Sequence, residues 1–445
     1  MSNTTLPPGP QGIALFRPLY QFTHQPLDFI ISTQRRYGDA ARFRFLKFPV
    51  YFFNRPSLIE EILIMQGAKF IKSADLREGS RVLGNGLLTS EGDFWRRQRK
   101  LTQPAFHRER VMAYAPVMTG YAEQMLDGWK DGETREIRAE MMQLTLKIAA
   151  RTLFGAELEA DTVRIIGDSL AAAVRQFDAR VKTGFLLPSH WPTPGNIRSR
   201  NAVNRLDEVL HRIIDQGRTA HSETEDLLSM LLSARDDAGA GMDSKQLRDE
   251  VMTLLLAGHE TTATALAWTF YLLAQNPTAE SRLLAELQAS ISGRAPAFED
   301  LPKLRFTEAI VRESLRLYPP AWAMGRQAIE DCTICGYHVP RNTTIYMSQW
   351  VVQRDARYFD EPDEFRPERW MDSLQKTLPK FAYFPFGGGP RVCIGASFAM
   401  MEATLLLAAI ASRFRITLVP GQMIRLWPSI TLRPRDGIQV VLSKR

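Results

Sequence analysis

Cys393 lies in a loop rich in glycine and proline, and an apolar helical pattern from Ala396 to about Phe414 follows it directly. The three consecutive glycines at 387–389 let the backbone approach a large flat group closely. Free N–H groups at the start of the following helix favour a thiolate at the cysteine. A thiolate held in this way predicts an axial ligand to haem iron. An isolated cysteine would more often be a small buried hydrophobic residue.

The loop fills a longer pattern, Phe-Gly-x-Gly-x-Arg-x-Cys-x-Gly, whose fixed positions are Phe386, Gly387, Gly389, Arg391, Cys393 and Gly395. A phosphate-binding loop is excluded, because no Gly-Lys-Ser/Thr follows and the spacing of a dinucleotide fingerprint is absent. The pattern resembles the haem-binding loop of the cytochrome P450 family. The resemblance implies haem b (iron protoporphyrin IX) as the cofactor, with Cys393 as the iron ligand and Phe386 packed beside it.

A second stretch predicts a long buried helix. Asp243 and Gln246 have the spacing of a capping box, the helical pattern runs without proline to about Gln275, and Asn276-Pro277 ends it. About 30 residues at about 1.5 Å each give a helix of roughly 45 Å, long enough to cross a domain. Its middle is apolar on nearly all sides, which is typical of a buried helix.

Residues 257–262 interrupt this helix with a glycine and a glutamate, both of which cost stability there. A kinked helix with a solvated glutamate would also give this pattern. The segment resembles the family's oxygen-binding groove over the haem. The resemblance implies that Ala257 and Gly258 lie against the haem, where Gly258 allows close approach. It also implies that Glu260 and Thr261 are the catalytic acid–alcohol pair, which delivers protons to oxygen.

Several basic residues could bind an anionic cofactor. Trp95 and Arg99 are one helical turn apart, and both side chains donate to carboxylates. In isolation they predict an exposed basic helix with one packed tryptophan. The resemblance implies a clamp on a haem propionate, with Arg326 and Arg391 as further propionate partners. A docking surface for an acidic redox partner and a merely solvated face are equally compatible with the neighbouring Arg96, Arg97 and Lys100.

Glu313 and Arg316 stand three residues apart in a predicted helix over about 306–317. Read alone, they would form a surface ion pair of little energetic value. The resemblance implies instead a buried triad with Arg369, which braces the core that holds the cysteine loop. At position 353 many relatives have a histidine, whereas this chain has Gln353.

Length alone would allow two or three domains, and one large domain is equally allowed. The resemblance implies one mostly α-helical domain over residues 1–445, with a smaller β-rich part from about 1–70 and 320–350. The chain has 445 residues, 45% hydrophobic and 24% charged, and no linker, repeat or secretory signal divides it. The resemblance implies the P450 fold, with a long central helix over the haem and the cysteine-ligand loop below it. We expect a helix at 26–37, strands at 41–45 and 50–53, an irregular connection at 71–93, and an acidic, glycine-rich surface connection at 219–243.

Charge and cysteine content limit the partners. The net charge of +7 suits an acidic protein partner and is too small and scattered for nucleic acid. Three cysteines without a signal peptide fit a reducing compartment, and Cys332 and Cys335 fall in a predicted hairpin turn with a structural role. There is no stretch of about 18 apolar residues, so no integral membrane segment is expected. We expect a soluble, cytoplasmic monomer.

The resemblance implies a monooxygenase that inserts one atom of O2 into a C–H or C=C bond of an apolar small molecule, either a fatty acid or a terpenoid. No flavin or iron–sulfur motif accompanies the haem loop, so electrons are expected from a separate ferredoxin or flavodoxin-type donor with its NAD(P)H reductase. The alternatives are a peroxygenase, an isomerase, and a non-catalytic haem sensor or carrier. The acid–alcohol pair favours O2 with electrons.

Five segments are candidates for lining the substrate site, namely 71–93, 170–195, 254–262, 321–324 and 428–430. Most of their residues are apolar, which favours an apolar ligand. A substrate carboxylate could be anchored by Arg77, Arg81 or Arg175, although free surface arginines are the more common case.

Overall fold

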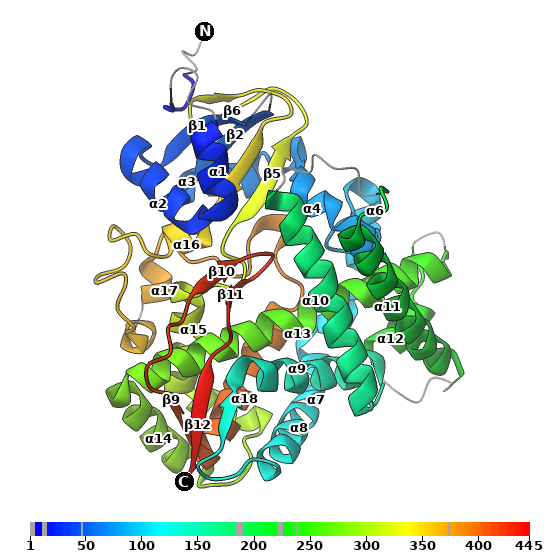
Figure 1. The fold of residues 1–445 in the computed structure, drawn as a ribbon, viewed down its shortest axis with the longest axis vertical. Helices are drawn as coiled ribbons and strands as arrows, with labels where there is room; N and C mark the ends of the chain where they lie inside the picture. The colour runs from blue at the N-terminus through cyan, green and yellow to red at the C-terminus, as the bar shows by residue number, and fades with distance from the viewer. Residues whose placement is uncertain are drawn as a thin grey trace.

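The computed structural model describes residues 5–10, 16–45, 48–182, 190–219, 226–236, 239–372 and 374–445. Helices form most of the molecule, and a five-stranded sheet lies at one end (Figure 1). The helices are α1 (Phe16–His24), α2 (Pro26–Tyr37), α3 (Pro56–Glu60), α4 (Ala74–Glu78), α5 (Ser80–Leu83), α6 (Gly92–Thr102), α7 (Arg108–Ala113), α8 (Ala115–Asp127), α9 (Ile137–Phe154), α10 (Ala160–Lys182), α11 (Pro194–Thr219), α12 (Leu227–Ser233), α13 (Ser244–Gln275), α14 (Pro277–Ile291), α15 (Arg305–Leu317), α16 (Gln349–Val352), α17 (Leu374–Thr377) and α18 (Ala396–Arg413). The strands are β1 (Ala40–Phe45), β2 (Phe48–Phe53), β3 (Phe70–Lys72), β4 (Thr134–Glu136), β5 (Met324–Ala328), β6 (Cys332–Ile334), β7 (Tyr337–Val339), β8 (Thr344–Met347), β9 (Phe414–Leu418), β10 (Leu426–Pro428), β11 (Leu432–Pro434) and β12 (Gln439–Lys444).

The largest sheet has the strand order β1-β2-β8-β5-β3 and joins the N-terminal segment to residues 324–347. β2 and β8 are parallel, with Phe52 opposite Tyr346, and the other neighbours are antiparallel. Phe43 lies on the same face of β1 as Ala41, and Ala41 is directly opposite Phe52 on β2. Both phenylalanines therefore pack against Phe29 of α2. The helix predicted at 26–37 and both predicted strands are confirmed.

The other sheets are built from short strands. β12 lies between β4 and β9, and β10 pairs with β11 as a hairpin. Sequence reasoning did not anticipate the strands after residue 413. β10 and β11 have three residues each, too few to show a periodic pattern, whereas the alternation of apolar and polar residues in β9 was missed. β6 and β7 form the predicted hairpin, and its turn contains Cys335 (φ 45°) and Gly336 (φ 85°).

Two segments that were expected to be connections contain helices. The 71–93 region holds β3, α4, α5 and the start of α6. Gly79 ends α4 and keeps a helical backbone (φ −59°), so that α5 follows directly, and Gly84 (φ +70°) ends α5. Within 219–243, α12 begins after Asp226, whose carboxylate accepts from the Ser229 N–H at 2.8 Å. The prediction of an irregular connection at 71–93 was wrong, because glycine marks helix ends as well as loops. The 219–243 segment is not confined to the surface, because leucines of α12 are buried.

The central helix α13 confirms the prediction of a long buried helix. Asp243 and Gln246 form its capping box, and Asn276 ends it. α13 crosses the middle of the molecule, with α9 alongside it (Figure 1). Its middle turns are therefore in a position to line an interior site.

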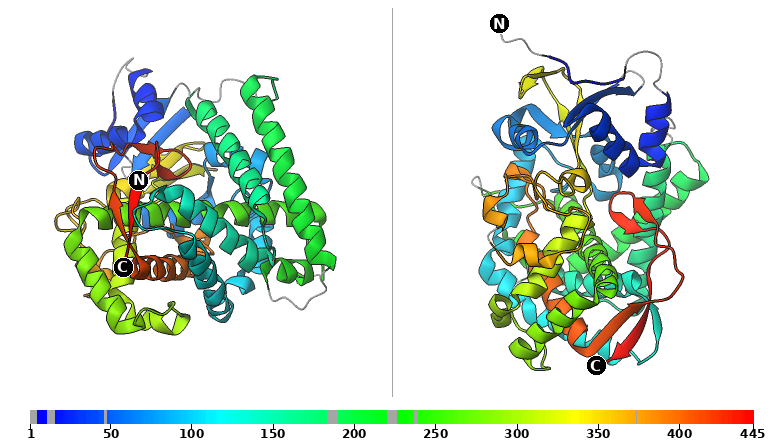
Figure 2. Two further views of the ribbon diagram at one scale, coloured as in Figure 1. Left: turned by 60° about the horizontal axis from the view of Figure 1, so that its bottom comes forward. Right: turned by 90° about the vertical axis from the view of Figure 1, so that its left-hand side faces the viewer.

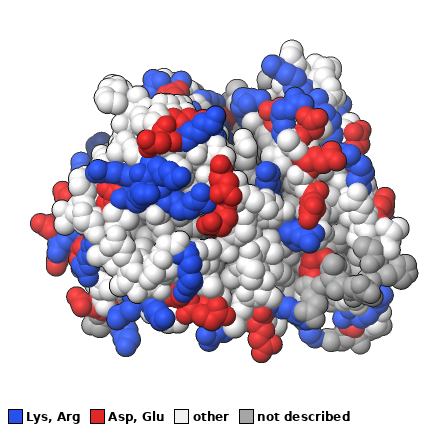
Figure 3. All heavy atoms as spheres, turned by 90° about the horizontal axis from the view of Figure 1, so that it is seen from below, with Lys and Arg blue, Asp and Glu red and all other residues white. Residues whose placement is uncertain are grey.

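α10 and α11 pack side by side at the periphery of the molecule (Figure 2). Among the described residues, α18 is the one helix whose length and composition would allow it to cross a membrane, and 67% of it is buried within the protein. Seen from below, acidic and basic side chains are interspersed with uncharged surface (Figure 3), as the scattered charge of the sequence predicts.

Candidate functional site

The cysteine loop packs directly on the short helix η1 (Glu61–Met65). Gly389 has a φ of +69°, and a Cβ at this position would lie 2.2 Å from the Leu63 carbonyl oxygen. Only glycine allows this approach without strain. The Cys393 N–H donates to the Phe386 carbonyl at 3.0 Å, which closes the loop around the proposed ligand.

Burial raises the pKa of the Cys393 thiol, and the Gly395 N–H and Arg99 oppose this effect only in part. The N–H group at the start of the helix lowers the pKa of the thiol, as predicted, but burial raises it by more. The side chain nevertheless keeps accessible surface. A sulfur that faces a cavity inside the protein would be both surrounded by protein and accessible. A metal ion bound there would compensate the thiolate charge, since a coordinating thiol is deprotonated.

One face of α13 is open although the rest of the helix is buried. Ala257 is exposed, and Leu256, Gly258 and Thr261 are half-buried, whereas the turns before and after them are buried. An open turn in the middle of a buried helix lines an interior space. A Cβ at Gly258 would make only ordinary contacts with α9, so the packing against α9 does not require glycine here.

Glu260 and Thr261 are adjacent in sequence but bond to different partners. The buried Glu260 carboxylate accepts from Thr431 Oγ1 at 2.8 Å and lies 3.8 Å from a guanidinium nitrogen of Arg138. The Thr261 hydroxyl donates to the Ala257 carbonyl at 2.7 Å. Successive residues of a helix do not face each other, so the acid and the alcohol cannot bond directly. Sequence reasoning missed Arg138 and Thr431, because they come from α9 and from the β10–β11 turn.

Three cationic side chains interact electrostatically near the cysteine loop. Arg391 lies over the Trp95 ring, 4.0 Å from its centroid, and pairs with Glu91. Burial and repulsion from Arg391 lower the pKa of Arg326 to about 10. The same two effects lower the pKa of Lys72 to about 7. Sequence reasoning missed Lys72, which lies on the short strand β3.

Glu91 does not balance this cluster of Lys72, Arg326 and Arg391. The other carboxyl group that acts on Lys72 is Glu250, which accepts from the Leu87 N–H at 3.0 Å. Burial raises the pKa of Glu250 to about 7, so it does not supply a full negative charge at neutral pH. The cluster therefore has an excess of buried positive charge, which a bound anionic group would compensate.

Arg99 and Arg97 point to different parts of the molecule. The Arg99 guanidinium donates to the Val392 carbonyl at 3.0 Å and so binds the cysteine loop. Arg97 pairs with Asp236 at 2.6 Å and donates to the Gly241 carbonyl at 2.9 Å. Arg97 thus ties α6 to the segment before α13, which makes it unsuitable as a free docking residue.

Glu313 and Arg316 form a fully buried ion pair at 2.8 Å rather than a surface pair. Arg369 lies 3.0 Å from the same carboxylate, and Trp370 Nε1 donates to it at 2.8 Å. The arrangement is the triad that the resemblance implied, with Trp370 as an additional donor that the sequence did not reveal. All the polar atoms of this carboxylate thus have partners, as a buried charge requires.

A family model for cytochrome P450 matches residues 7–441. The chain belongs to the cytochrome P450 family. Among solved structures, cyanobacterial CYP120A1 with retinoic acid bound aligns to this P450 with a TM-score of 0.87 and 27% identity. The alignment covers 99% of this chain and 100% of that one.

Three curated relatives are similar over nearly their whole length. Cyclooctatin synthase of Streptomyces melanosporofaciens is 38% identical, with 95% of this P450 and 92% of the relative covered. Cyclooctat-9-en-7-ol 5-monooxygenase of the same species is 34% identical, with 93% and 90% covered. Pentalenene oxygenase of Streptomyces avermitilis is 33% identical, with 94% and 92% covered. This P450 is accordingly a haem-dependent monooxygenase.

The residues of the site fit a haem. The interior surface of Cys393 suits an iron ligand, and the excess charge of Lys72, Arg326 and Arg391 suits the two carboxylates of the group. When bound, haem with a thiolate ligand supplies the activation of O2 for insertion into C–H bonds. The open turn of α13 at Ala257 offers an apolar wall for this chemistry.

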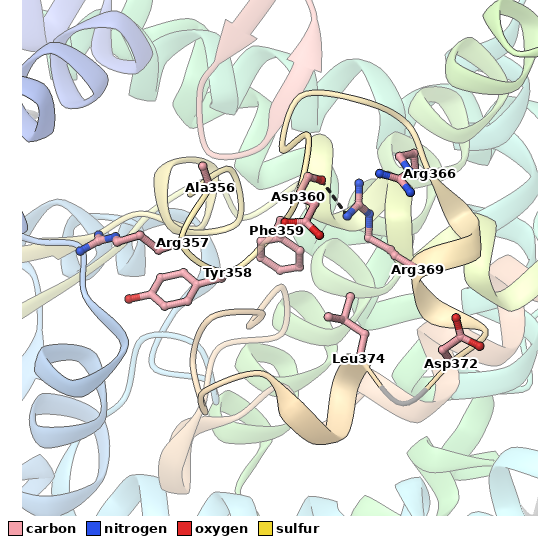
Figure 4. Close-up of a pocket in the computed structure, with 9 residues that line it drawn as sticks. All are labelled: Ala356, Arg357, Tyr358, Phe359, Asp360, Arg366, Arg369, Asp372 and Leu374. Carbon is pink, nitrogen blue, oxygen red and sulfur yellow. Dashed lines mark hydrogen bonds between the residues drawn. The ribbon is translucent and has the colours of Figure 1, made fainter.

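Two surface pockets lie apart from this interior space. One, of about 280 Å³, is lined by residues within 356–374 (Figure 4). There Arg369 already donates to the Asp360 carbonyl at 3.0 Å. The other, of about 360 Å³, lies beside the cysteine loop and is lined by Phe386, Gly387 and Met400 among others. The second pocket gives access to the outer side of the loop.

Proposed function

We propose that this P450 oxygenates a neutral terpenoid, inserting one atom of O2 into a C–H or C=C bond. The observation that carries the proposal is the open apolar turn of α13 at Ala257. Two segments that are hydrogen-bonded to α13 lie on either side of this turn. Similarity to proteins named for pentalenene and for cyclooctat-9-en-7-ol, both terpenoids, supports the substrate class.

Hydrogen bonds fix where the bracketing segments meet α13. The loop at 84–91 is held on one side, since the Leu87 N–H donates to Glu250 at 3.0 Å. The β10–β11 turn is held on the other side, since Thr431 donates to Glu260 at 2.8 Å. The two anchors are about ten residues, or about 15 Å, apart along the helix, and Ala257 lies between them.

The bracketing segments carry exposed apolar side chains. Leu88 is 37% exposed in the first segment, and Ile430 is 41% exposed in the second. Residues 320–322 are tied to the second segment, because Trp322 Nε1 donates to the Ser429 carbonyl at 2.9 Å. An apolar ligand gains about 25 cal/mol for each Å² of such surface that it removes from water.

The charges near these segments favour a neutral ligand over a fatty acid. Arg77 donates to the Lys72 carbonyl and to Gln327, both at 2.6 Å. Arg81 pairs with Glu78 at 2.6 Å. Of the three arginines considered as carboxylate anchors, Arg175 on α10 is the one that has neither a hydrogen bond nor an ion pair from its side chain within the described residues.

Within this proposal, each site residue has a distinct role. Cys393 binds the iron of haem b, Phe386 packs beside it, and Arg99 holds the loop through Val392. Trp95, Arg326 and Arg391 bind the haem propionates, together with Lys72. Ala257 and Gly258 would lie against the haem. Glu260 and Thr261 would hold and move protons at the open turn of α13, linked by an intervening water, because their side chains bond to different partners.

Electrons come from a separate ferredoxin or flavodoxin-type donor with its NAD(P)H reductase. The pocket beside Phe386 and Met400 supports approach of the donor from the outer side of the cysteine loop. Cytoplasmic location and a monomeric state remain predictions, and one sedimentation experiment tests the latter.

Titration of the ferric protein tests the substrate class. A neutral cyclic diterpene alcohol and a fatty acid of equal carbon number are compared by the shift of the Soret band. We expect the terpenoid to bind at least about tenfold more tightly, a difference of about 1.4 kcal/mol. Tighter binding of the fatty acid, weakened by Arg175→Gln, would overturn the proposal. If hydrogen peroxide alone gives the same product yield as O2 with NAD(P)H and the redox partner, the result would favour a peroxygenase.

A further inference from the structure

Gln353 follows α16 and is completely buried. Its side-chain Nε2 donates to the carbonyls of Leu315 and Arg316, at 3.0 and 3.1 Å. Its Oε1 accepts from the Phe384 N–H at 3.0 Å. Both donor hydrogens and the acceptor of one amide group are thus in use, far from solvent.

These three bonds join two elements of the site. Leu315 and Arg316 lie in the last turn of α15, where carbonyl groups have no partner within the helix. Phe384 begins the cysteine loop, and its carbonyl accepts from the Gly387 N–H at 2.9 Å. The chain of backbone bonds continues with the Cys393 N–H, which donates to Phe386 at 3.0 Å.

The main chain of Gln353 also contacts the buried triad. Its carbonyl accepts from Nη1 of Arg316 at 2.9 Å. The same arginine pairs with Glu313, which accepts from the Arg366 N–H at 2.9 Å. Gln353 is therefore the residue at which the triad, the end of α15 and the cysteine loop meet.

We propose that Gln353 is a positioning residue, which sets the place of the cysteine loop relative to α15 and thereby stabilises thiolate ligation by Cys393. A glutamine amide offers two donors and one acceptor in a single plane, which matches this set of partners. A neutral histidine offers one donor and one acceptor, glutamate offers no donor, and leucine offers neither. This inference concerns ligation of the iron and does not depend on which substrate is oxidised.

The test compares Gln353→Leu, Gln353→Glu and Gln353→His in the haem-loaded protein. The first readout is the fraction of the reduced carbonyl complex with a thiolate-type spectrum, at equal haem content. The second is hydrogen–deuterium exchange of the peptide 384–393. We expect Gln353→Leu to raise exchange of this peptide and the rate of loss of the thiolate-type spectrum by roughly tenfold, because a buried N–H loses its acceptor.

Gln349 provides a matched control in the same segment. It is also fully buried, and neither polar atom of its side chain has a hydrogen-bond partner within the described part of the chain. Gln349→Leu should leave both readouts within about twofold of the parent protein. Equal effects of the two leucine variants would overturn the proposal, since both remove a buried amide from one turn of chain.

If Gln353→Leu does not fold, the comparison between Gln353→His and Gln353→Glu still tests the proposal. Gln353→His keeps an acceptor for Phe384 and one donor for α15, so it should retain most of the thiolate-type spectrum. Gln353→Glu places a carboxylate against the carbonyls of Leu315 and Arg316, so it should lose this spectrum several-fold faster. Equal stability of the spectrum in these two variants would contradict a positioning role.

Discussion

The Arg391 guanidinium lies over the Trp95 indole, with its central carbon 4.0 Å from the ring centroid. The contact joins α6 to the cysteine loop and holds Arg391 where its charge acts on Arg326 and Lys72. A cation over a desolvated indole contributes about 2 kcal/mol. The stack therefore keeps the cationic cluster assembled for an anionic partner.

Trp95→Leu should weaken retention of haem. Loss of the stack leaves Arg391 held only by Glu91 and the Ser90 carbonyl. The lost contact of about 2 kcal/mol corresponds to roughly thirtyfold faster transfer of haem to apomyoglobin. Trp427→Leu is the control. Trp427 lies on the β10–β11 hairpin and also has a cation over its ring, since Lys182 lies 4.4 Å from the ring centroid. A similar rate of haem transfer in the two variants would show that the stack at Trp95 has no special role.

Glu313→Gln should destabilise the fold strongly. The substitution leaves Arg316 and Arg369 as buried cations without a counter-charge, which costs about 3–5 kcal/mol. Glu308→Gln on the same helix removes a half-exposed pair with Arg312 and should cost less than about 1 kcal/mol. Urea unfolding of both variants measures the difference, and equal midpoints would contradict the buried triad.

Features encoded by neighbouring residues could be predicted from the sequence. Asp243 and Gln246 cap α13, and the chain turns at Asn276, because caps and prolines act on the adjacent backbone. The loop at Cys393 is recognisable for the same reason, since its glycines and its ligand are contiguous. The helix bounds and the cysteine loop therefore did not depend on tertiary structure.

Contacts between distant segments could not be predicted in this way. Glu313 and Arg316 read alone as a surface pair, and only family resemblance indicated burial with Arg369. Lys72 enters the cationic cluster from β3, and Arg138 approaches Glu260 from α9. No local pattern marks such residues, because their partners are chosen by the packing of whole elements.

Thr261→Ala should uncouple electron use from product formation. The Thr261 hydroxyl is on the open turn of α13 and donates to the Ala257 carbonyl at 2.7 Å. Loss of a proton-transfer group costs about 100-fold or more in the step that it serves, so product per NAD(P)H should fall sharply. Substrate affinity should change less than about twofold, and Thr261→Ser should restore coupling.

Thr269 supplies the control for this experiment. Its hydroxyl donates to the Ala265 carbonyl at 2.8 Å, the same bond two turns further along α13, but the residue is buried away from the open turn. Thr269→Ala removes an equivalent hydroxyl and should leave product per NAD(P)H unchanged. Loss of coupling in both variants would assign the effect to the helix rather than to proton transfer.

The pH dependence of stability should contain a contribution from Glu402. Complete burial in α18 raises the pKa of this carboxyl group from 4.5 to about 8, and the Thr262 hydroxyl opposes the shift only in part. Between these values the native state holds a proton that the unfolded chain releases, so stability falls as pH rises through this window, by up to about 1.4 kcal/mol per unit. Glu402→Gln should flatten this slope of the urea midpoint with pH, while Glu250, whose pKa burial raises from 4.5 to about 7, still contributes a slope of the same sign between these values. Identical slopes in the parent and the variant would mean that Glu402 is ionised in the native protein.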